Sequence, residues 1–209
     1  MQELNSRNIA EIRNQFGDDF VEKVTVSALN KAAPKLQTYI SKSIRQRYNI
    51  TAADVKRKAK RFKAKRSADK VYQASVLFQG SQIGYTNFSA KPKRVTLGRK
   101  TKKGRPWGRF RTGVSVKVLK SSGQKQIKSR PAFLAVGMSG NRQVFYRDPR
   151  GRKTSTGKTA LHSMKGPSIP DMVMASEGDS GEPYDVFAAQ EFDTEFDRAT
   201  DYYLSKMNG

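Results

Sequence analysis

Hydrophobic residues recur at helical spacing in two segments near the ends of the chain. From residue 19 to residue 47 the pattern predicts a helix with one apolar face, formed by Leu29, Ala33, Leu36, Ile40 and Ile44. Pro34 lies inside this segment and predicts either a kink or two consecutive helices. From residue 184 to residue 207 we expect another helix, whose apolar stripe is Phe187, Phe192, Phe196, Ala199, Tyr203 and Leu204.

The middle of the chain instead alternates apolar and polar residues, which is typical of strands. The strand candidates are residues 71–78, 83–88, 113–120, 132–137 and 142–148. We expect the first two to pair through a turn at 79–82, and the last two to form a hairpin through 138–141. Helices at both ends of an antiparallel β-sheet predict an α+β fold, with residues 1–209 as a single domain.

Two basic extensions and one acidic spacer interrupt this pattern. Thr51 and Asp54 form a capping-box pattern, which predicts a basic helix over residues 51–70; nine of the residues from 56 to 70 are Lys or Arg. Residues 89–112 show little periodicity and predict a long basic arm or loop. Residues 174–183 are expected to form an acidic spacer before the last helix.

Composition limits the classes of protein that fit. The chain is 36% hydrophobic and 28% charged, which is lean for a globular core. It contains no cysteine, so disulfides and thiolate metal sites are excluded. None of its segments approaches the ~18 apolar residues of a bilayer-spanning helix, and the polar N-terminal segment does not resemble a signal peptide. We therefore expect a soluble protein made in a cytoplasm, with no membrane partner.

The net charge of +23 is unevenly distributed along the chain. Residues 51–130 carry 24 basic and 2 acidic side chains, whereas residues 166–209 carry 2 basic and 10 acidic ones. Such a basic middle and acidic tail allow two interpretations: the middle binds an acidic partner such as nucleic acid, or neighbouring copies attract one another in an assembly. From charge alone the two interpretations are evenly matched.

Three groups of residues are the candidates for these contacts. The basic candidates for an acidic partner are Lys56, Arg57, Lys60, Arg61, Lys63, Lys65 and Arg66. In the arm, cations alternate with aromatic anchors that could stack on bases or bind a neighbouring subunit: Arg105, Trp107, Arg109, Phe110 and Arg111. On the last helix Asp193, Asp197 and Asp201 are spaced i, i+4, i+8, which indicates a solvated or partner-facing surface.

The sequence does not contain a complete set of catalytic or nucleotide-binding residues. The GRKTSTGKTA stretch at 151–160 carries GKT, but Gly151 and Gly157 are separated by one residue too many for a phosphate-binding loop, and prolines follow closely. His162 is the only histidine and is expected to be a loop residue. We therefore predict no enzyme activity, no catalytic residue, no metal site and no cofactor.

Three segments together resemble one family. They are VSALNKAAPKLQTYISKSIRQRYNITAADVKRKAKRFKAKR at 26–66, RPAFLAVGMSGNRQVFYRD at 130–148, and HSMKGPSIPDMV at 162–173. In order and spacing they are similar to the prophage minor tail protein Z family, over about half of the chain. In the third segment Pro167, Ile169 and Pro170 match the proline-containing element of the family.

The resemblance implies a structural virion protein of a tailed phage or prophage, without catalysis. Such a protein would complete the head-proximal end of the tail and enable head–tail joining, and it would lie in the host cytoplasm during assembly. The implied state is a homo-oligomeric ring, often sixfold, in contact with a tail terminator, tail tube or connector. The basic arm would wrap a neighbour or approach DNA in the channel. The alternative is a nucleic-acid-binding protein that contacts DNA through residues 56–66 and 91–111.

Overall fold

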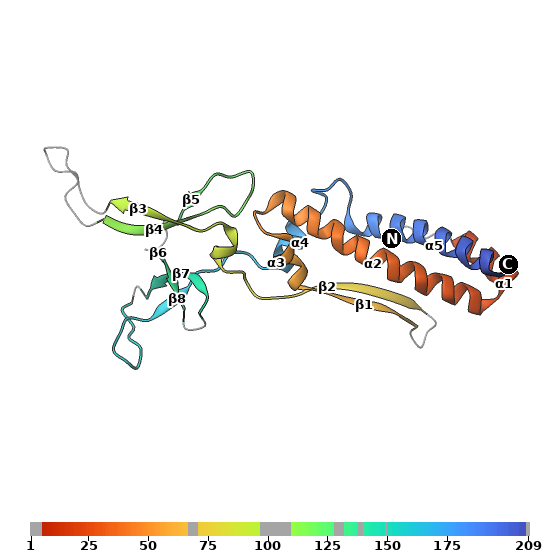
Figure 1. Cartoon of the computed structure of the whole chain (residues 1–209), viewed down its shortest axis with the longest axis horizontal. Coiled ribbons are helices and arrows are strands. Elements are labelled where there is room, and N and C mark those ends of the chain that lie inside the picture. Colours follow the sequence, from red (N-terminus) through yellow and green to blue (C-terminus); the bar gives the residue numbers. More distant parts are fainter. Residues whose placement is uncertain are drawn as a thin grey trace. The chain divides into compact units, whose positions relative to one another are not determined.

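The structure, a computed structural model, describes residues 6–66, 71–96, 110–127, 132–137, 140–148 and 150–207. The chain divides into two compact units, each continuous in space but not in sequence (Figure 1). Unit 1 contains Met1–Ile44, Val55–Gln79 and Val173–Gly209, and unit 2 contains Arg45–Asp54 and Gly80–Met172. Long helices and antiparallel sheets together make an α+β fold, which confirms the predicted fold class.

Three helices form the body of unit 1: α1 (Ser6–Phe16), α2 (Asp18–Arg47) and α5 (Tyr184–Met207). Gly17, with a φ of 83°, separates α1 from α2, and its left-handed backbone lets the chain reverse at the end of α1. The sequence predicted α2 and α5 correctly but not α1, whose segment is polar. Of the two alternatives for Pro34, separate helices are wrong, because α2 is assigned as one helix through that residue.

The core of unit 1 lies between α2 and α5, which run side by side (Figure 1). Its buried members are Phe20, Val24, Ala28, Ala32, Phe192, Phe196 and Ala199. The aromatic rings of Phe192 and Phe196 lie 5.7 Å apart, as their i, i+4 spacing on one helix face requires. Nearer the start of α5, the rings of Tyr39 and Phe187 stack at 3.9 Å with an interplanar angle of 6°.

A charged network also joins α2 to α5. The Lys35 ammonium donates to Glu191 and to Glu195, each at 2.7 Å, and the Arg198 guanidinium donates to the same oxygen of Glu195 at 2.6 Å. The Glu195 side chain is only 5% exposed. The hydrogen bond from Lys35 is the largest cause that lowers the pKa of Glu195, against the opposing effect of burial.

The basic helix predicted over residues 51–70 is wrong. The capping box is present, since Thr51 Oγ1 accepts from Asp54 N at 3.2 Å, but α3 ends after one and a half turns (Ala52–Arg57). The chain then forms β1 (Ala59–Arg66), which pairs antiparallel with β2 (Tyr72–Phe78). The partner that the sequence predicted for β2, residues 83–88, instead contains a short 3-10 helix, η1 (Tyr85–Phe88).

In the described part of unit 2 the strands form two three-stranded antiparallel sheets rather than one continuous sheet. The first has the order β3–β4–β5, formed by Lys91–Thr96, Phe110–Val116 and Lys125–Gln126. The second has the order β6–β7–β8, formed by Ala132–Val136, Arg142–Arg147 and Leu161–Ser163. The predicted hairpin of residues 132–148 is confirmed as β6 and β7. The predicted arm at 89–112 is wrong at both ends, which are strands β3 and β4; residues 97–109 lie outside the described residues.

A small core holds unit 2 together, with Val114, Val116, Ala132 and Val144 as its buried members. The segment that follows β8 packs closely against η1. A Cβ atom placed on Gly166 would lie 2.8 Å from the ring of Phe88, which is fully buried. Only glycine therefore fits at this position without movement of the ring.

Candidate functional site

Most of the predicted basic residues lie on the hairpin of β1 and β2 in unit 1. Lys56 and Arg57 end α3, and the exposed cations of β1 are Lys60, Arg61, Lys63 and Lys65. The main chain of Arg66 pairs with Tyr72 at the end of the strand, and its side chain is not among the described ones. The four cations of β1 make no ion pair with a carboxylate in the part of the chain that the structure describes.

One face of the hairpin lies against α2. Ala64 N donates to the side-chain oxygen of Asn30 at 2.9 Å, and Tyr72 Oη donates to Glu22 at 2.9 Å. Alternate residues of β2 are half-buried on this side: Tyr72, Ala74, Val76 and Phe78. Because α2 covers this face, the alternation of β2 follows from its packing on the helix.

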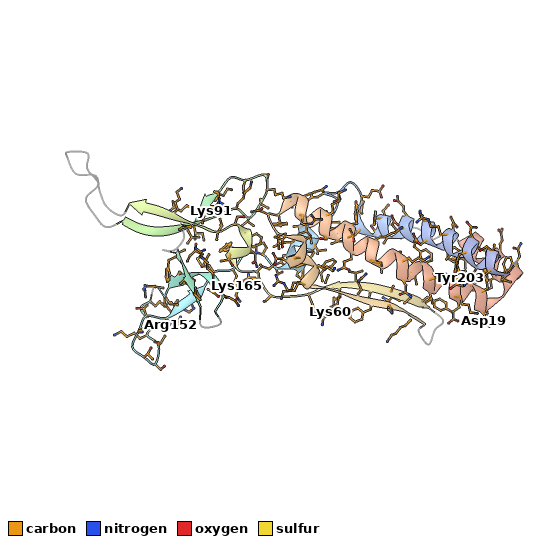
Figure 2. All side chains as sticks on the ribbon, in the orientation of Figure 1. Asp19, Lys60, Lys91, Arg152, Lys165 and Tyr203 are labelled. Carbon is orange, nitrogen blue, oxygen red and sulfur yellow. The ribbon has the colours of Figure 1, made fainter. Side chains whose placement is uncertain are left out.

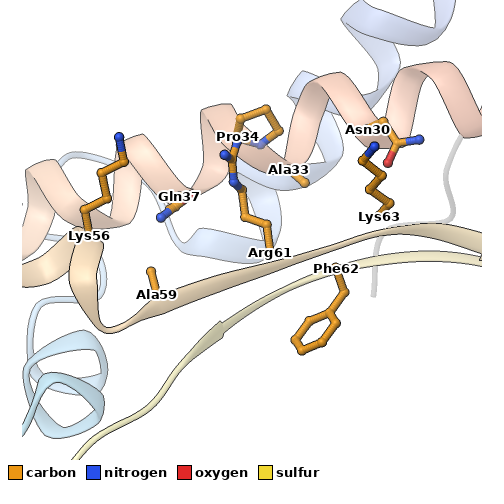
Figure 3. Close-up of a pocket in the computed structure, with 9 residues that line it drawn as sticks. All are labelled: Asn30, Ala33, Pro34, Gln37, Lys56, Ala59, Arg61, Phe62 and Lys63. Carbon is orange, nitrogen blue, oxygen red and sulfur yellow. The ribbon is translucent and has the colours of Figure 1, made fainter.

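A hollow of about 440 Å³ remains between α2 and β1. Figure 3 shows Arg61 and Lys63 directed toward α2, where they lie near Pro34 and Asn30, while Phe62 points to the opposite side of the hairpin. Three cations, two amides and four apolar residues line this hollow, with no carboxylate, histidine or hydroxyl group among them to form a catalytic set with the lysines.

The other face of the hairpin is uncovered in the chain as described. We call it the outer hairpin face and define it by Lys60, Phe62, Lys65, Gln73, Ser75 and Leu77, which oppose one another in register. Phe62 is 50% exposed and Leu77 is 45% exposed, beside the cations of the same face. A bulge places Lys63 and Ala64 opposite one residue of β2, which keeps Phe62 and Lys65 on the same face. Figure 2 labels Lys60 on this hairpin.

The predicted acidic residues of α5 form an exposed ridge. Asp193, Asp197 and Asp201, which we call the acidic ridge, are all exposed, unlike Glu195 on the same helix. Although Asp193 is exposed, partial desolvation by the surrounding helix surface, followed by the neighbouring carboxylate of Asp197, raises its pKa above the ordinary value. Tyr202, next to the ridge, is 51% exposed. The ridge therefore carries like charges one turn apart, with an aromatic ring at its C-terminal end.

The predicted aromatic-basic arm is mostly outside the described residues. This applies to Arg105, Trp107 and Arg109. The backbones of Phe110 and Arg111 belong to β4, opposite Thr96 and Val95, so both begin a strand rather than continue an arm.

The GRKTSTGKTA stretch forms a closed turn and not a phosphate cradle. Lys153 pairs with Thr159, Thr154 N donates to Lys158 O at 2.7 Å, and Gly157 N donates back to Thr154 O at 2.9 Å. Strand β8 follows at Leu161, where a phosphate-binding loop would require a helix.

An electrostatic clasp lies at the base of this turn and was not predicted from the sequence. The buried Asp148 carboxylate accepts from Arg150 N at 2.8 Å, and its Oδ2 lies 3.1 Å from Arg152 Nε and 3.3 Å from His162 Nε2. The main-chain bond from Arg150 is the largest cause that lowers the pKa of Asp148. Figure 2 labels Arg152 in this turn. The sequence contains one indication of these contacts: Asp148 is the single acidic residue between positions 131 and 165, among several cations.

The three residues of the proline-containing element lie at the start of α4 (Ile169–Ala175). Pro167 O accepts from Ile83 N at 3.3 Å, Ile169 is fully buried, and Pro170 occupies the first turn of the helix. Ser168 caps α4, with its hydroxyl 2.6 Å from the Asp171 carboxylate. The element therefore anchors a helix start and contributes no reactive group.

The family model of prophage minor tail protein Z (GPZ) matches residues 7–207. The chain belongs to this family. Among curated proteins and among solved structures, nothing matches the chain. As a minor tail protein, it is a structural component of a phage tail, and thus of a virion, and it is not an enzyme.

The described residues of this minor tail protein also bear on metal sites and membrane spans. No cluster of three or more His, Asp or Glu side chains suited to a metal ion occurs among them. No helix in the same residues combines the length and the apolar character that crossing a bilayer needs. What the described surface offers instead is a basic hairpin and an acidic ridge.

Proposed function

We propose that this minor tail protein completes the head-proximal end of the tail and so makes the tail able to join a DNA-filled head. The observation that carries the proposal is the family match over residues 7–207. The opposed charges of the basic hairpin and the acidic ridge support it, because a completion protein must bind several neighbours at once.

The proposed state is a homo-oligomeric ring, with six copies as the working expectation for a component at the tail end. A ring needs a head-to-tail contact that uses two different surfaces of each copy, and unit 1 carries two surfaces of opposite charge. Its neighbours would be the tail terminator, the tail tube or the connector, and assembly would take place in the host cytoplasm.

Deletion of the gene from an inducible prophage tests the proposed role. We expect DNA-filled heads and full-length tails to accumulate separately, and purified protein added to the lysate to restore joined particles. Electron microscopy and plaque counts measure both. Joined particles in the absence of the protein, or tails that do not form at all, would contradict a role in completion.

A second candidate, DNA binding through residues 56–66 and 91–111, rests on the exposed cations of β1 that have no carboxylate partner among the described residues. Binding to duplex DNA at several salt concentrations tests it. A monomer that binds with a steep fall of log affinity against log salt would favour DNA as the partner. A defined ring that binds DNA weakly would favour the tail role.

A further inference from the structure

The outer hairpin face lacks a covering partner in the described chain, although it exposes apolar side chains. Phe62 and Leu77 are about half exposed on it, and Lys60 and Lys65 flank them. Antiparallel sheets can leave one face to water, but the exposed Phe62 and Leu77 make this face a candidate for cover by another surface. The flanking cations favour a covering surface that is acidic at its edges.

The acidic ridge has the complementary composition. Its three carboxylates make no ion pair within the described residues, whereas Glu191 and Glu195 on the same helix are bound by Lys35. Repulsion among the three aspartates lowers the stability of α5 in an isolated chain, and an opposing cationic surface would relieve that repulsion. The half-exposed ring of Tyr202 follows Asp201 in the chain, and the Lys206 ammonium lies 4.9 Å from the centre of this ring.

The two surfaces also match in length. On a helix, Asp193 and Asp201 are eight residues apart, which corresponds to about 12 Å along the axis. On β1, the bulge residues Lys63 and Ala64 together occupy one strand position. Lys60 and Lys65 are therefore four strand positions apart, or roughly 13 Å. A helix laid along the hairpin thus places an acid near each cation, with Phe62 between them.

We propose that the acidic ridge of one copy docks on the outer hairpin face of a second copy of this chain. The contact is head-to-tail, so each copy gives one surface and receives the other. Duplex DNA would satisfy the cations but not the apolar side chains between them, which favours a protein partner. The inference rests on the proposed role as an oligomeric tail component, and it identifies the surfaces that meet.

Charge reversal in two separate variants tests the contact. One variant carries Lys60→Glu and Lys65→Glu, and the other carries Asp193→Lys and Asp201→Lys, the two aspartates whose spacing matches that of the lysines. In sedimentation velocity at low salt we expect the wild type to self-associate and each variant alone to associate about 10- to 100-fold more weakly. An equimolar mixture of the two variants should recover association, because each reversed surface then meets a complementary one on the other variant.

A third variant, Lys120→Glu with Lys125→Glu, makes the same change of charge at two exposed lysines of unit 2 and is the matched control. It should associate like the wild type. Recovery in the mixture also shows that both reversed variants are folded. A monomeric wild type, undiminished association of the single variants, or a mixture that stays monomeric would each overturn the proposed contact.

The outcomes separate this contact from the proposed role and from DNA binding. If both reversed variants still form wild-type oligomers and restore head–tail joining, the contact is wrong and the role stands. If the wild type fails to restore joining, the role is wrong whatever its oligomeric state. If reversal on the hairpin abolishes duplex binding but leaves self-association unchanged, DNA is the partner of this face and the contact is wrong.

Discussion

Replacement of Lys35 by Met should loosen the packing of α5 on α2. Lys35 donates two charge-assisted hydrogen bonds of 2.7 Å, and one of them reaches the buried carboxylate of Glu195. Such a bond to a charged group contributes about 1.5–3 kcal/mol. The Lys35 side chain is 39% exposed, so solvent screens its ion pairs. Arg198 also remains bound to Glu195, and we expect a loss of about 1–3 kcal/mol in the free energy of unfolding.

The effect depends on pH in a defined direction. The pKa of Glu195 in the folded protein lies below its ordinary value of 4.5. The network therefore stabilises the fold above pH 4.5, and this stabilisation is lost as the pH falls through the lower pKa of the folded state. The difference in stability between Lys35→Met and the wild type should shrink over that acidic range.

Urea denaturation followed by far-UV circular dichroism, at neutral pH and at a series of values below 4.5, measures both effects. Lys42→Met, at an exposed lysine of the same helix, is the control and should unfold like the wild type. Equal destabilisation by the two substitutions, or a Lys35→Met effect that does not change with pH, would refute the role assigned to the network.

Three further outcomes are expected in unit 2. Gly166→Ala should lower the free energy of unfolding by about 1–2 kcal/mol in thermal unfolding, because the overpacking against Phe88 exceeds the gain from a stiffer unfolded chain. Gly123→Ala, which has open space around its Cβ, is the control and should not lower it. Asp148→Asn should speed proteolysis within residues 150–158, and unchanged cleavage would show that the clasp does not order the turn. Added ATP should not change the thermal stability of the wild type or of Lys158→Ala. If ATP stabilises the wild type and Lys158→Ala removes that effect, our interpretation of GRKTSTGKTA is wrong.

The long helices were predictable because packing and periodicity agree. Phe192 and Phe196 fall on one face of a helical projection, and in the structure both enter the core with Ala28 and Ala32. The pairing of β1 with β2 was not predictable by the same means. Lys and Arg favour helices, and the real capping box at Thr51 strengthened a helical interpretation. Contacts with residues distant in sequence, such as the bond from Ala64 to Asn30, decide the strand conformation.

The candidate surfaces were predictable in composition but not in arrangement. The sequence identifies the cations of residues 56–66 and the three aspartates of α5, because charge counts need no tertiary structure. It does not separate the outer face of the hairpin from the face toward α2, since that depends on the bulge after Phe62. It also does not show that Glu195 is buried and paired with Lys35, whereas Asp197 on the same helix is exposed.

The lysines of β1 have a consequence for copies that have not yet assembled. A two-stranded sheet has open edges, and identical edges on two molecules can pair by main-chain hydrogen bonds into an unproductive aggregate. Here such pairing would bring Lys60, Lys63 and Lys65 of one molecule against the same residues of another. Mutual repulsion opposes this symmetric pairing, so separate molecules should keep the hairpin free for the docking contact proposed above, even at high protein concentration.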